Sequence, residues 1–407
     1  MICVEFDLDP EFVLGHRAQV TLRGMGRPDV YARRRKRALV ACAVLSGAAG
    51  VIAGAGAGDD PPPPAIPATV CDRTGHGAAA LTAGQRVMVR MEARATRELL
   101  AQARSGEIGG VILFPPPDVE GDRLASEIGR LQAAAHEGGN PPLLVAIDQE
   151  GGIVERLPAL APQLSPSALA EQNRPASARL EGSATAFQLR ELGVNVNLAP
   201  VMDVPSSEAQ FMTPRAFGDS PGKVARLALA FAAGQRSESL ASTAKHFPGL
   251  GQAVENTDLA PTTIDVPRSA LAADIAPFRA AADAGVELIM LSSAAYPRLG
   301  SGDTPAVLSP VIVGELLRGE LGFQGVTISD DLLAPAVALS HSRREAAIAA
   351  AAAGVDILLF AAKDTPGVAR ALRQAGAAGK LTQEGMQASC ARIVALKERV
   401  GFSESSP

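Results

Sequence analysis

The sequence predicts an α/β fold, a single (β/α)₈ barrel of the TIM type, on three observations. Short runs of β-branched or apolar residues alternate with longer alanine-rich segments of helical pattern, as in βα units around a parallel sheet. Eight such units follow one another over roughly 320 residues, which suits one barrel better than two domains. Several alanine-rich segments end in glycine directly before an apolar run, which is typical of a helix-to-strand loop.

The eight expected strands give the order of the barrel along the chain. They cover residues 86–89, 110–114, 143–147, 194–198, 242–246, 288–291, 326–329 and 357–360. Two helices are expected to end at the glycines of the segments 283–285 and 352–354. Charged residues stand at the carboxyl ends of several strands, where barrel enzymes build their active sites. These residues are Asp203, Lys245, His246, Asp330 and Asp331.

The residues before the barrel predict export. The basic residues 33–37 (RRRKR) precede the apolar run 38–58, and Ala-Gly-Ala near its end is a candidate cleavage site. We therefore assign residues 1–58 to an N-terminal extension with a signal peptide, or alternatively with an uncleaved membrane anchor through 38–58. Residues 59–78 form a proline-rich linker, and residues 79–403 form the barrel domain. The expected location is extracellular or in the cell envelope.

Charge and aromatic content exclude some classes of function. The chain has 407 residues and a formal net charge of -5, and its basic residues are interspersed with acidic ones. Such a surface offers no basic stripe for a nucleic-acid backbone, so we expect no nucleic-acid partner. The chain has no tryptophan and two tyrosines, which is unusual for a protein that binds extended polysaccharides. A small pocket is therefore expected rather than a long cleft.

The four cysteines do not predict a metal site. They stand at positions 3, 42, 71 and 390, with no CxxC pair and no histidine at ligand spacing. Cys71 precedes the expected barrel and Cys390 lies near its end. A disulfide between them in an oxidising compartment and two unrelated thiols are both compatible with the sequence.

The segment LLVAIDQEGGIVER, residues 143–156, joins an apolar strand to a charged strand end. Asp148 follows the strand and is expected at the barrel mouth, where a carboxylate accepts strong hydrogen bonds from ligand hydroxyls. Gly151 and Gly152 allow the backbone to turn tightly behind it. The alternative is an ordinary strand-end carboxylate paired with Arg156.

Two further segments end expected strands in charged residues. AKHFPGLG places Lys245 and His246 side by side before a Pro-Gly turn. Because neighbouring strand residues face opposite sides, we expect one of them to reach the pocket and the other to brace its rim. GVTISDD ends in Asp330 and Asp331, of which one can point into the mouth as a nucleophile while loop amides hold the other. The alternative is that this pair caps a helix N-terminus.

In this order, the motifs IDQEGG, KHFPGLG and GVTISDD, with NLAPVMDV and PRAFG, resemble the family-3 glycoside hydrolases, in particular their single-domain β-N-acetylglucosaminidase-like branch. The likeness covers roughly residues 80–400. It implies a retaining β-glycosidase with Asp330 as the nucleophile. It implies that the hydroxyls of the terminal sugar are bound by Asp148, Arg156, Arg215, Lys245 and His246. The family works without a metal or an organic cofactor, so none is expected.

The loop after KHFPG departs from the family pattern. That branch usually has GHG there, followed by Asp-Ser-His as the acid/base motif, whereas this chain has Leu250 and then Asn-Thr-Asp at 256–258. The alignment places Asp258 as the replacement proton donor and Glu255 as the second candidate. A carboxylic acid can serve in this role when its environment keeps it protonated.

The leading hypothesis is an exo-acting retaining β-N-acetylhexosaminidase that removes terminal N-acetylglucosamine from cell-wall-type glycans through an aspartyl glycosyl-enzyme. One alternative is a weak or inactive sugar-binding relative, and another is a transferase or phosphorylase variant. Ile153 and Ser293 stand where the family often has arginine and histidine, which leaves the 2-substituent of the sugar open. We expect a carbohydrate substrate and a monomer.

Overall fold

The computed structural model describes Cys71, residues 82–362 and residues 366–401, all of which belong to one compact unit of the chain. The expected extension and signal or anchor (1–58) lie outside the described residues, as does the expected linker (59–78) apart from Cys71. Among the helices that are described, none has both the length and the apolar character to cross a membrane.

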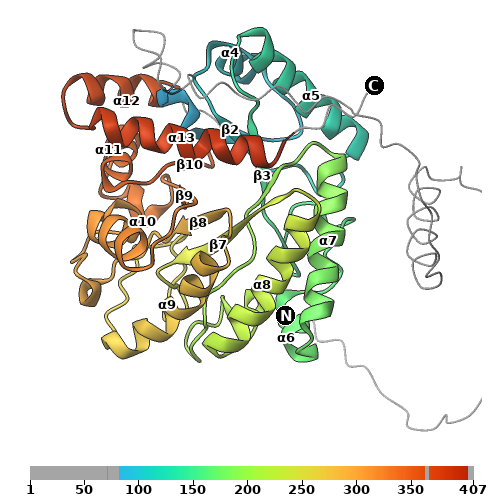
Figure 1. Cartoon of the computed structure of the whole chain (residues 1–407), viewed down its shortest axis with the longest axis vertical. Coiled ribbons are helices and arrows are strands. Elements are labelled where there is room, and N and C mark those ends of the chain that lie inside the picture. The colour runs from blue at the N-terminus through green and yellow to red at the C-terminus, as the bar shows by residue number, and fades with distance from the viewer. Residues whose placement is uncertain (1–70, 72–81, 363–365, 402–407) are drawn as a thin grey trace, which may run out of the picture. The chain divides into compact units, whose positions relative to one another are not determined.

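Eight parallel strands form a sheet at the centre of this unit (Figure 1). Their order is β10-β1-β2-β3-β6-β7-β8-β9, so the sheet follows the order of the chain. A parallel bridge between Ile328 and Ile357 joins its two ends, and the sheet nearly closes into a barrel. The strands are β1 (Val87–Met91), β2 (Gly110–Leu113), β3 (Leu144–Ile147), β6 (Val196–Asn197), β7 (Ala241–Phe247), β8 (Leu288–Leu291), β9 (Val326–Ser329) and β10 (Leu358–Phe360). The predicted barrel is confirmed, with one counterpart for each expected strand.

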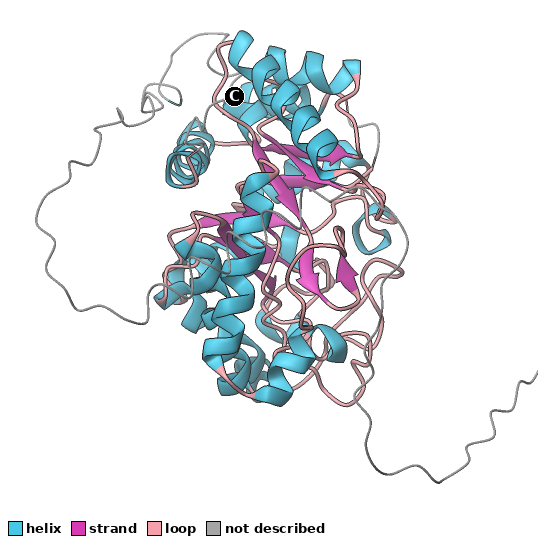
Figure 2. Ribbon diagram, turned by 90° about the vertical axis from the view of Figure 1, so that its right-hand side faces the viewer, coloured by secondary structure: helices cyan, strands magenta, loops and turns pink. Residues whose placement is uncertain are grey.

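Helices surround the strands, as Figure 2 shows. The α-helices are α4 (Arg97–Ser105), α5 (Gly121–Glu137), α6 (Pro166–Gln172), α7 (Pro175–Glu191), α8 (Pro221–Ser237), α9 (Arg268–Asp283), α10 (Pro335–Ala338), α11 (Arg343–Ala353), α12 (Val368–Ala377) and α13 (Gln383–Arg399). A π-helical segment, η4 (Val311–Glu320), and three short 3₁₀ turns, η1 (Thr213–Arg215), η2 (Pro297–Leu299) and η3 (Ala306–Leu308), complete the layer. The two helix ends expected from glycine occur at α9 and α11; Gly354, at φ 103°, adopts the left-handed conformation that favours glycine.

The alternation of side chains along the strands divides the core into two layers. Val87 and Val89 of β1 pack with the surrounding helices, whereas Met88 between them belongs to a separate cluster of strand residues inside the barrel. Ile393 and Leu396 of α13 join this inner cluster. The last helix therefore packs directly against the barrel interior.

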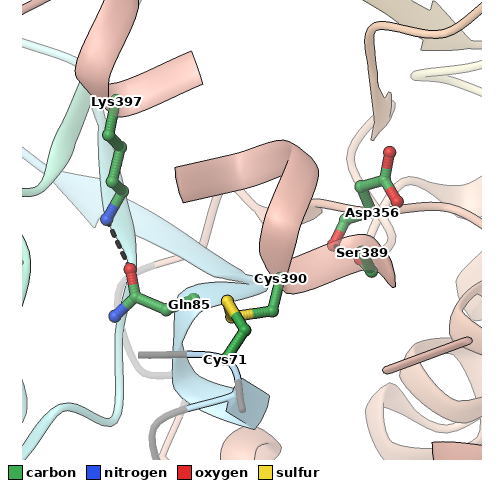
Figure 3. Close-up of a disulfide and its surroundings, with 6 residues drawn as sticks. All are labelled: Cys71, Gln85, Asp356, Ser389, Cys390 and Lys397. Carbon is green, nitrogen blue, oxygen red and sulfur yellow. Dashed lines mark hydrogen bonds between the residues drawn. A yellow bond between two sulfur atoms is a disulfide. The ribbon is translucent and has the colours of Figure 1, made fainter. Parts of the chain in front are cut away.

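A disulfide ties the N-terminal side of the described unit to its last helix. Cys71 and Cys390 are bonded, with Cα atoms 5.8 Å apart and a sequence separation of 319 (Figure 3). Both are buried and pack with Val394 of α13. Of the two alternatives left by the sequence, the disulfide is confirmed.

Candidate active site

A cavity of about 600 Å³ lies at the carboxyl ends of the barrel strands. Its wall comes from segments far apart in sequence, including the ends of β2, β3, β7, β9 and β10. The structure brings together there all seven residues predicted as site residues. They are Asp148, Arg156, Arg215, Lys245, His246, Asp258 and Asp330.

Asp148 stands directly after β3, where the chain leaves the barrel and forms the small antiparallel pair β4 (Gln149–Gly151) and β5 (Val154–Glu155). Its Oδ1 accepts a hydrogen bond from Lys245 Nζ at 2.9 Å, and its Oδ2 one from Arg156 Nη2 at 3.4 Å. Burial alone would raise the pKa of Asp148, but the two positive charges outweigh it and the pKa lies below its ordinary value. Asp148 therefore presents an anionic acceptor to the cavity.

The tight turn expected behind Asp148 is present. Gly151, at φ 99°, occupies the left-handed region, and a Cβ at this position would come within 2.7 Å of Pro162 Cγ. Glycine is thus required both by the backbone conformation and by the close approach of the neighbouring loop.

Glu150 is a site residue that sequence reasoning left without a role. It is 2% exposed and accepts two hydrogen bonds from Arg215, at 2.8 and 2.9 Å, while Lys245 Nζ lies 2.6 Å from its Oε1. Burial alone would raise the pKa of Glu150, but the positive charges of Lys245 and Arg215 have the larger effect and bring the pKa down to about 2. The sequence could have indicated Glu150 as a site residue, because it stands two residues after Asp148 and residues i and i+2 of an extended segment share a face.

Lys245 lies between these two carboxylates. It is 2% exposed, and burial lowers its pKa, but Asp148 and Glu150 outweigh burial and the pKa is raised above its ordinary value. A lysine held between two anions keeps its charge and has little freedom to move. It can therefore hold Asp148 in one orientation at the cavity wall.

His246 is fixed by Asp203, which sequence reasoning placed at a strand end without a role. The Asp203 Oδ2 lies 2.7 Å from the His246 Nδ1, and its Oδ1 accepts hydrogen bonds from the backbone N–H groups of His246 and Leu250. Because Nδ1 is engaged and the ring lines the cavity, Nε2 is the nitrogen that can meet a ligand.

The expectation that Lys245 and His246 face opposite sides was wrong, since both line the cavity. The pairing of β7 with β8 shifts register between Ala244 and Phe247, and such irregularities redirect side chains at strand ends. The peptide bond between Lys245 and His246 is cis.

Both carboxylates after β9 line the cavity and are partly exposed, so the expected division holds only in that loop amides bind Asp331. Asp331 Oδ1 accepts hydrogen bonds from the backbone of Leu333 and Ala361, both at 3.0 Å. Asp330 is partly exposed to the cavity and accepts from the Asp331 N–H at 2.8 Å. The helix-cap alternative is wrong, because α10 begins at Pro335 with Ala334 in the cap position.

Asp330 has an unusual electrostatic environment. Burial raises its pKa to about 6; the charge of His246 opposes this rise, and that of Asp258 adds to it. A carboxylate at the end of a barrel strand, partly exposed to a cavity and flanked by a histidine, is placed to react with a bound ligand.

The loop after β7 places the two candidate proton donors differently. Asn256, Thr257 and Asp258 line the cavity, whereas Glu255 is exposed and is not part of the wall. Asp258 N–H donates to Asn256 Oδ1 at 3.0 Å, which holds the local turn. Geometry therefore favours Asp258 over Glu255.

A cation–π stack forms another part of the wall. The guanidinium carbons of Arg90 and Arg156 each lie 4.4 Å from the centre of the Phe114 ring. Arg90 and Phe114 were not identified from the sequence. Within the part of the chain that the structure describes, no group of three or more His, Cys, Asp or Glu side chains could hold a metal ion.

Comparison with known proteins identifies the family. The model of the glycosyl hydrolase family 3 N-terminal domain matches residues 81–396. An uncharacterized secreted glycosyl hydrolase of Arthroderma benhamiae is 35% identical over 334 residues, covering 79% of this chain and 94% of the relative.

Two solved structures are similar in fold and sequence. A family 3 β-N-acetylglucosaminidase from Paenibacillus sp. has a TM-score of 0.77 and 30% identity, covering 81% of this chain; the chain spans 64% of its length. A β-N-acetylhexosaminidase from Beutenbergia cavernae has a TM-score of 0.72 and 33% identity, covering 79% of this chain and 98% of that one. With its motifs, its barrel and the match over residues 81–396, this chain belongs to glycosyl hydrolase family 3.

Proposed function

We propose that this glycoside hydrolase is an exo-acting retaining β-N-acetylhexosaminidase that removes terminal N-acetylglucosamine from cell-wall-type glycans. The observation that carries the proposal is the position of Asp330 in the cavity wall together with the charged cluster around Asp148. The similar solved enzymes from Paenibacillus sp. and Beutenbergia cavernae, named for β-N-acetylglucosamine and β-N-acetylhexosamine, support the choice of sugar.

In the proposed mechanism, Asp330 is the nucleophile. Its carboxylate attacks the anomeric carbon while the bond to the leaving oxygen breaks, and Asp258 gives its proton to that oxygen. A water molecule then gives a proton to Asp258 and attacks the anomeric carbon, which releases Asp330. Asp258 lines the same cavity wall as Asp330, as a proton donor to the leaving oxygen must.

The remaining charged residues are proposed to orient the terminal sugar. Asp148 offers carboxylate oxygens to sugar hydroxyls, and Arg156 and His246 offer donors at the wall of the same cavity. Lys245 and Arg215 both contact Glu150. We propose that they bind the sugar and also hold the Glu150 carboxylate in place. Such preorganised groups favour the transition state because they need not reorient during the reaction.

The disulfide and the secreted relative support export of the protein. Disulfides persist in oxidising compartments, and Cys71–Cys390 is buried and bonded here. We propose an extracellular or cell-envelope location. In this proposal the segment 38–58 is either cleaved or kept as a membrane anchor. The proposed oligomeric state is a monomer.

The test is release of 4-nitrophenol from 4-nitrophenyl N-acetyl-β-glucosaminide by the full chain. We expect turnover that Asp330→Ala abolishes. Asp258→Ala should lower kcat by about 10² to 10⁴ on substrates with poor leaving groups, because general acid assistance is lost. Glu255→Ala is the matched control, since this carboxylate lies on the same loop outside the cavity wall, and its rate should equal that of the wild type.

Three outcomes would contradict the proposal in different ways. Phosphate-stimulated turnover with formation of the sugar phosphate would identify a phosphorylase, in which the anion needs no acid/base in the second step. Binding of the sugar without turnover, by a protein with an intact melting transition, would identify a sugar-binding relative. Asp330-independent release would remove Asp330 from the mechanism.

A further inference from the structure

A buried carboxyl group lies against the turn that carries His246. Asp274 belongs to α9, is 1% exposed and lies outside the cavity wall. Its Oδ1 accepts one long hydrogen bond, at 3.4 Å, from Gln252 Nε2, and its Oδ2 has no hydrogen-bond partner among the described residues. Burying a carboxylate with so few donors is costly, so these surroundings favour the neutral acid.

Residues 246–252 form the turn, and its backbone packs directly against Asp274. A hydrogen bond of 2.9 Å from the Gly249 N–H to the His246 carbonyl closes it. Gly249 has a φ of 132°, and a Cβ at this position would lie 2.6 Å from the Asp274 Cβ. The Tyr296 hydroxyl donates to the Gly249 carbonyl at 2.9 Å. The seated turn therefore touches Asp274 and helps to keep water from its carboxyl group.

A second carboxylate, that of Asp203, binds the same turn. Its Oδ1 accepts hydrogen bonds from the backbone N–H groups of His246 and Leu250, at 3.2 and 2.6 Å. Burial raises the pKa of Asp274 to about 7; the hydrogen bond from Gln252 opposes the rise, and the negative charge of Asp203 adds to it. Ionisation of Asp274 would thus set a second negative charge against the turn.

In the described part of the chain, no element packed against α9 offers a positive partner to an ionised Asp274. The helix contacts α8 and β7. The basic residues of these three elements are Arg268, Arg279, Lys223, Arg226, Arg236, Lys245 and His246. None of those described forms an ion pair with Asp274; Arg236, Lys245 and His246 instead contact other carboxylates. The other titratable neighbours are Asp203 and Tyr296, and burial raises the pKa of the Tyr296 phenol, which keeps it neutral.

We propose that Asp274 is a positioning residue for His246: its neutral carboxyl group keeps the turn 246–252 seated on α9, and its ionisation loosens the turn. The buried anion would have no positive partner and would be repelled by Asp203, and opening of the turn would admit water to it. His246 would then leave its place in the cavity wall. This inference rests on the proposed function, because His246 is there proposed to bind the terminal sugar.

The raised pKa of Asp274 determines how opening of the turn depends on pH. The seated turn binds the Asp274 proton more tightly than an opened, hydrated turn, in which an aspartate titrates near 4. Opening should therefore become up to about tenfold more frequent per pH unit between about 4 and 7, and should not change further above 7.

The first test is amide hydrogen exchange of the full chain at several pH values. The N–H groups of Gly249 and Leu250 are the probes, because both are hydrogen-bonded within the seated turn. After correction for the intrinsic effect of pH on exchange, their rates in the wild type should rise between about pH 4 and 7 and level off above. This measurement requires neither substrate nor a variant.

Asp274→Asn should remove this pH dependence, because its side chain keeps an oxygen for Gln252 and cannot ionise. Asp283→Asn is the matched control, since it makes the same substitution at an exposed position of the same helix; it should keep the wild-type exchange profile and activity. Asp274→Ala leaves Gln252 without its acceptor and should lower kcat/KM at every pH, so that Asp274→Asn exceeds it.

The second test asks whether the turn acts on the reaction. It uses the ratio of kcat/KM for Asp274→Asn to that for the wild type, with 4-nitrophenyl N-acetyl-β-glucosaminide as the substrate. Titration of the cavity residues is common to both proteins and cancels in this ratio. We expect the ratio to rise about tenfold overall with increasing pH and to level off above about 7, because only the wild type loses the seated turn.

Different results would overturn different parts of the inference. Corrected exchange that does not depend on pH in the wild type, or that keeps the same slope in Asp274→Asn, would show that Asp274 does not hold the turn. A constant activity ratio would show that the turn does not position His246 for the reaction. Absence of turnover in the wild type would instead contradict the proposed function, and the exchange profile would still decide whether Asp274 holds the turn.

Discussion

At the residue scale, Asp330 shows how the environment of one carboxylate determines its chemistry. Its pKa is raised by burial to about 6, with His246 opposing the rise and Asp258 adding to it. Attack on the anomeric carbon requires the ionised form. Protonation of Asp330 should therefore remove activity as the pH falls through about 6 rather than near 4, where an ordinary aspartate titrates.

This predicts the acid limb of the pH profile. The kcat/KM value for the 4-nitrophenyl substrate should fall about tenfold per pH unit well below pH 6, because one essential group becomes protonated. His246→Gln should move the limb to higher pH, since a charge that lowers the pKa is removed, and Asp258→Ala should move it to lower pH. A limb near pH 4 that neither substitution shifts would contradict the assignment.

Residues whose role depends on a partner were harder to predict than residues that follow a motif. Asp148 and Asp330 were found from the sequence because each ends an apolar strand. Glu150 and Asp203 were in view but had no assigned role, because their partners Arg215 and His246 come from other βα units. A local pattern shows which side chain is near a strand end, but not which distant side chain it will meet.

At the element scale, α13 closes the barrel interior with a buried lysine among its apolar residues. Lys397 is 5% exposed, and its Nζ donates to Gln85 Oε1 at 2.6 Å (Figure 3). It also donates to the Gly109 carbonyl at 2.9 Å. Burial lowers its pKa to about 7. The folded protein thus binds this proton more weakly than the unfolded chain, in which lysine titrates near 10.4.

This predicts that the free energy of unfolding rises with pH between about 7 and 10. In that window the unfolded state binds one more proton, so the contribution of Lys397 is about 1.4 kcal/mol per pH unit and is lost as the pH falls toward 7. Denaturant titrations at several pH values measure it. Lys397→Met should remove this rise, whereas Lys380→Met, at an exposed position, should keep it. Parallel curves for Lys397→Met and the wild type would contradict the prediction.

At the scale of the whole molecule, the Cys71–Cys390 disulfide joins the start of the described unit to its last helix. It closes a loop of 319 residues, so it restricts the unfolded chain far more than a bond between near neighbours would. Because α13 also packs into the barrel interior, the bond holds an element on which the inner core depends. Its effect should therefore appear in global stability.

Cys390→Ser is expected to lower the free energy of unfolding by about 2–5 kcal/mol, as for other native disulfides. Denaturant unfolding with and without a reductant measures it. The reduced wild type should match the variant, and the reductant should have no further effect on Cys390→Ser. Equal stability of the oxidised wild type and Cys390→Ser would show that the bond does not constrain the fold.

The sequence by itself determined the barrel, the order of its strands, and the arrival of Asp148 and Asp330 at the carboxyl ends. These features depend on periodicity and on strand ends, which are local properties of the chain. Only the tertiary structure decided that Lys245 joins Asp148 to Glu150 and that Asp203 holds His246. These contacts join segments 43 to 97 residues apart, and closure of the barrel decides which of them meet.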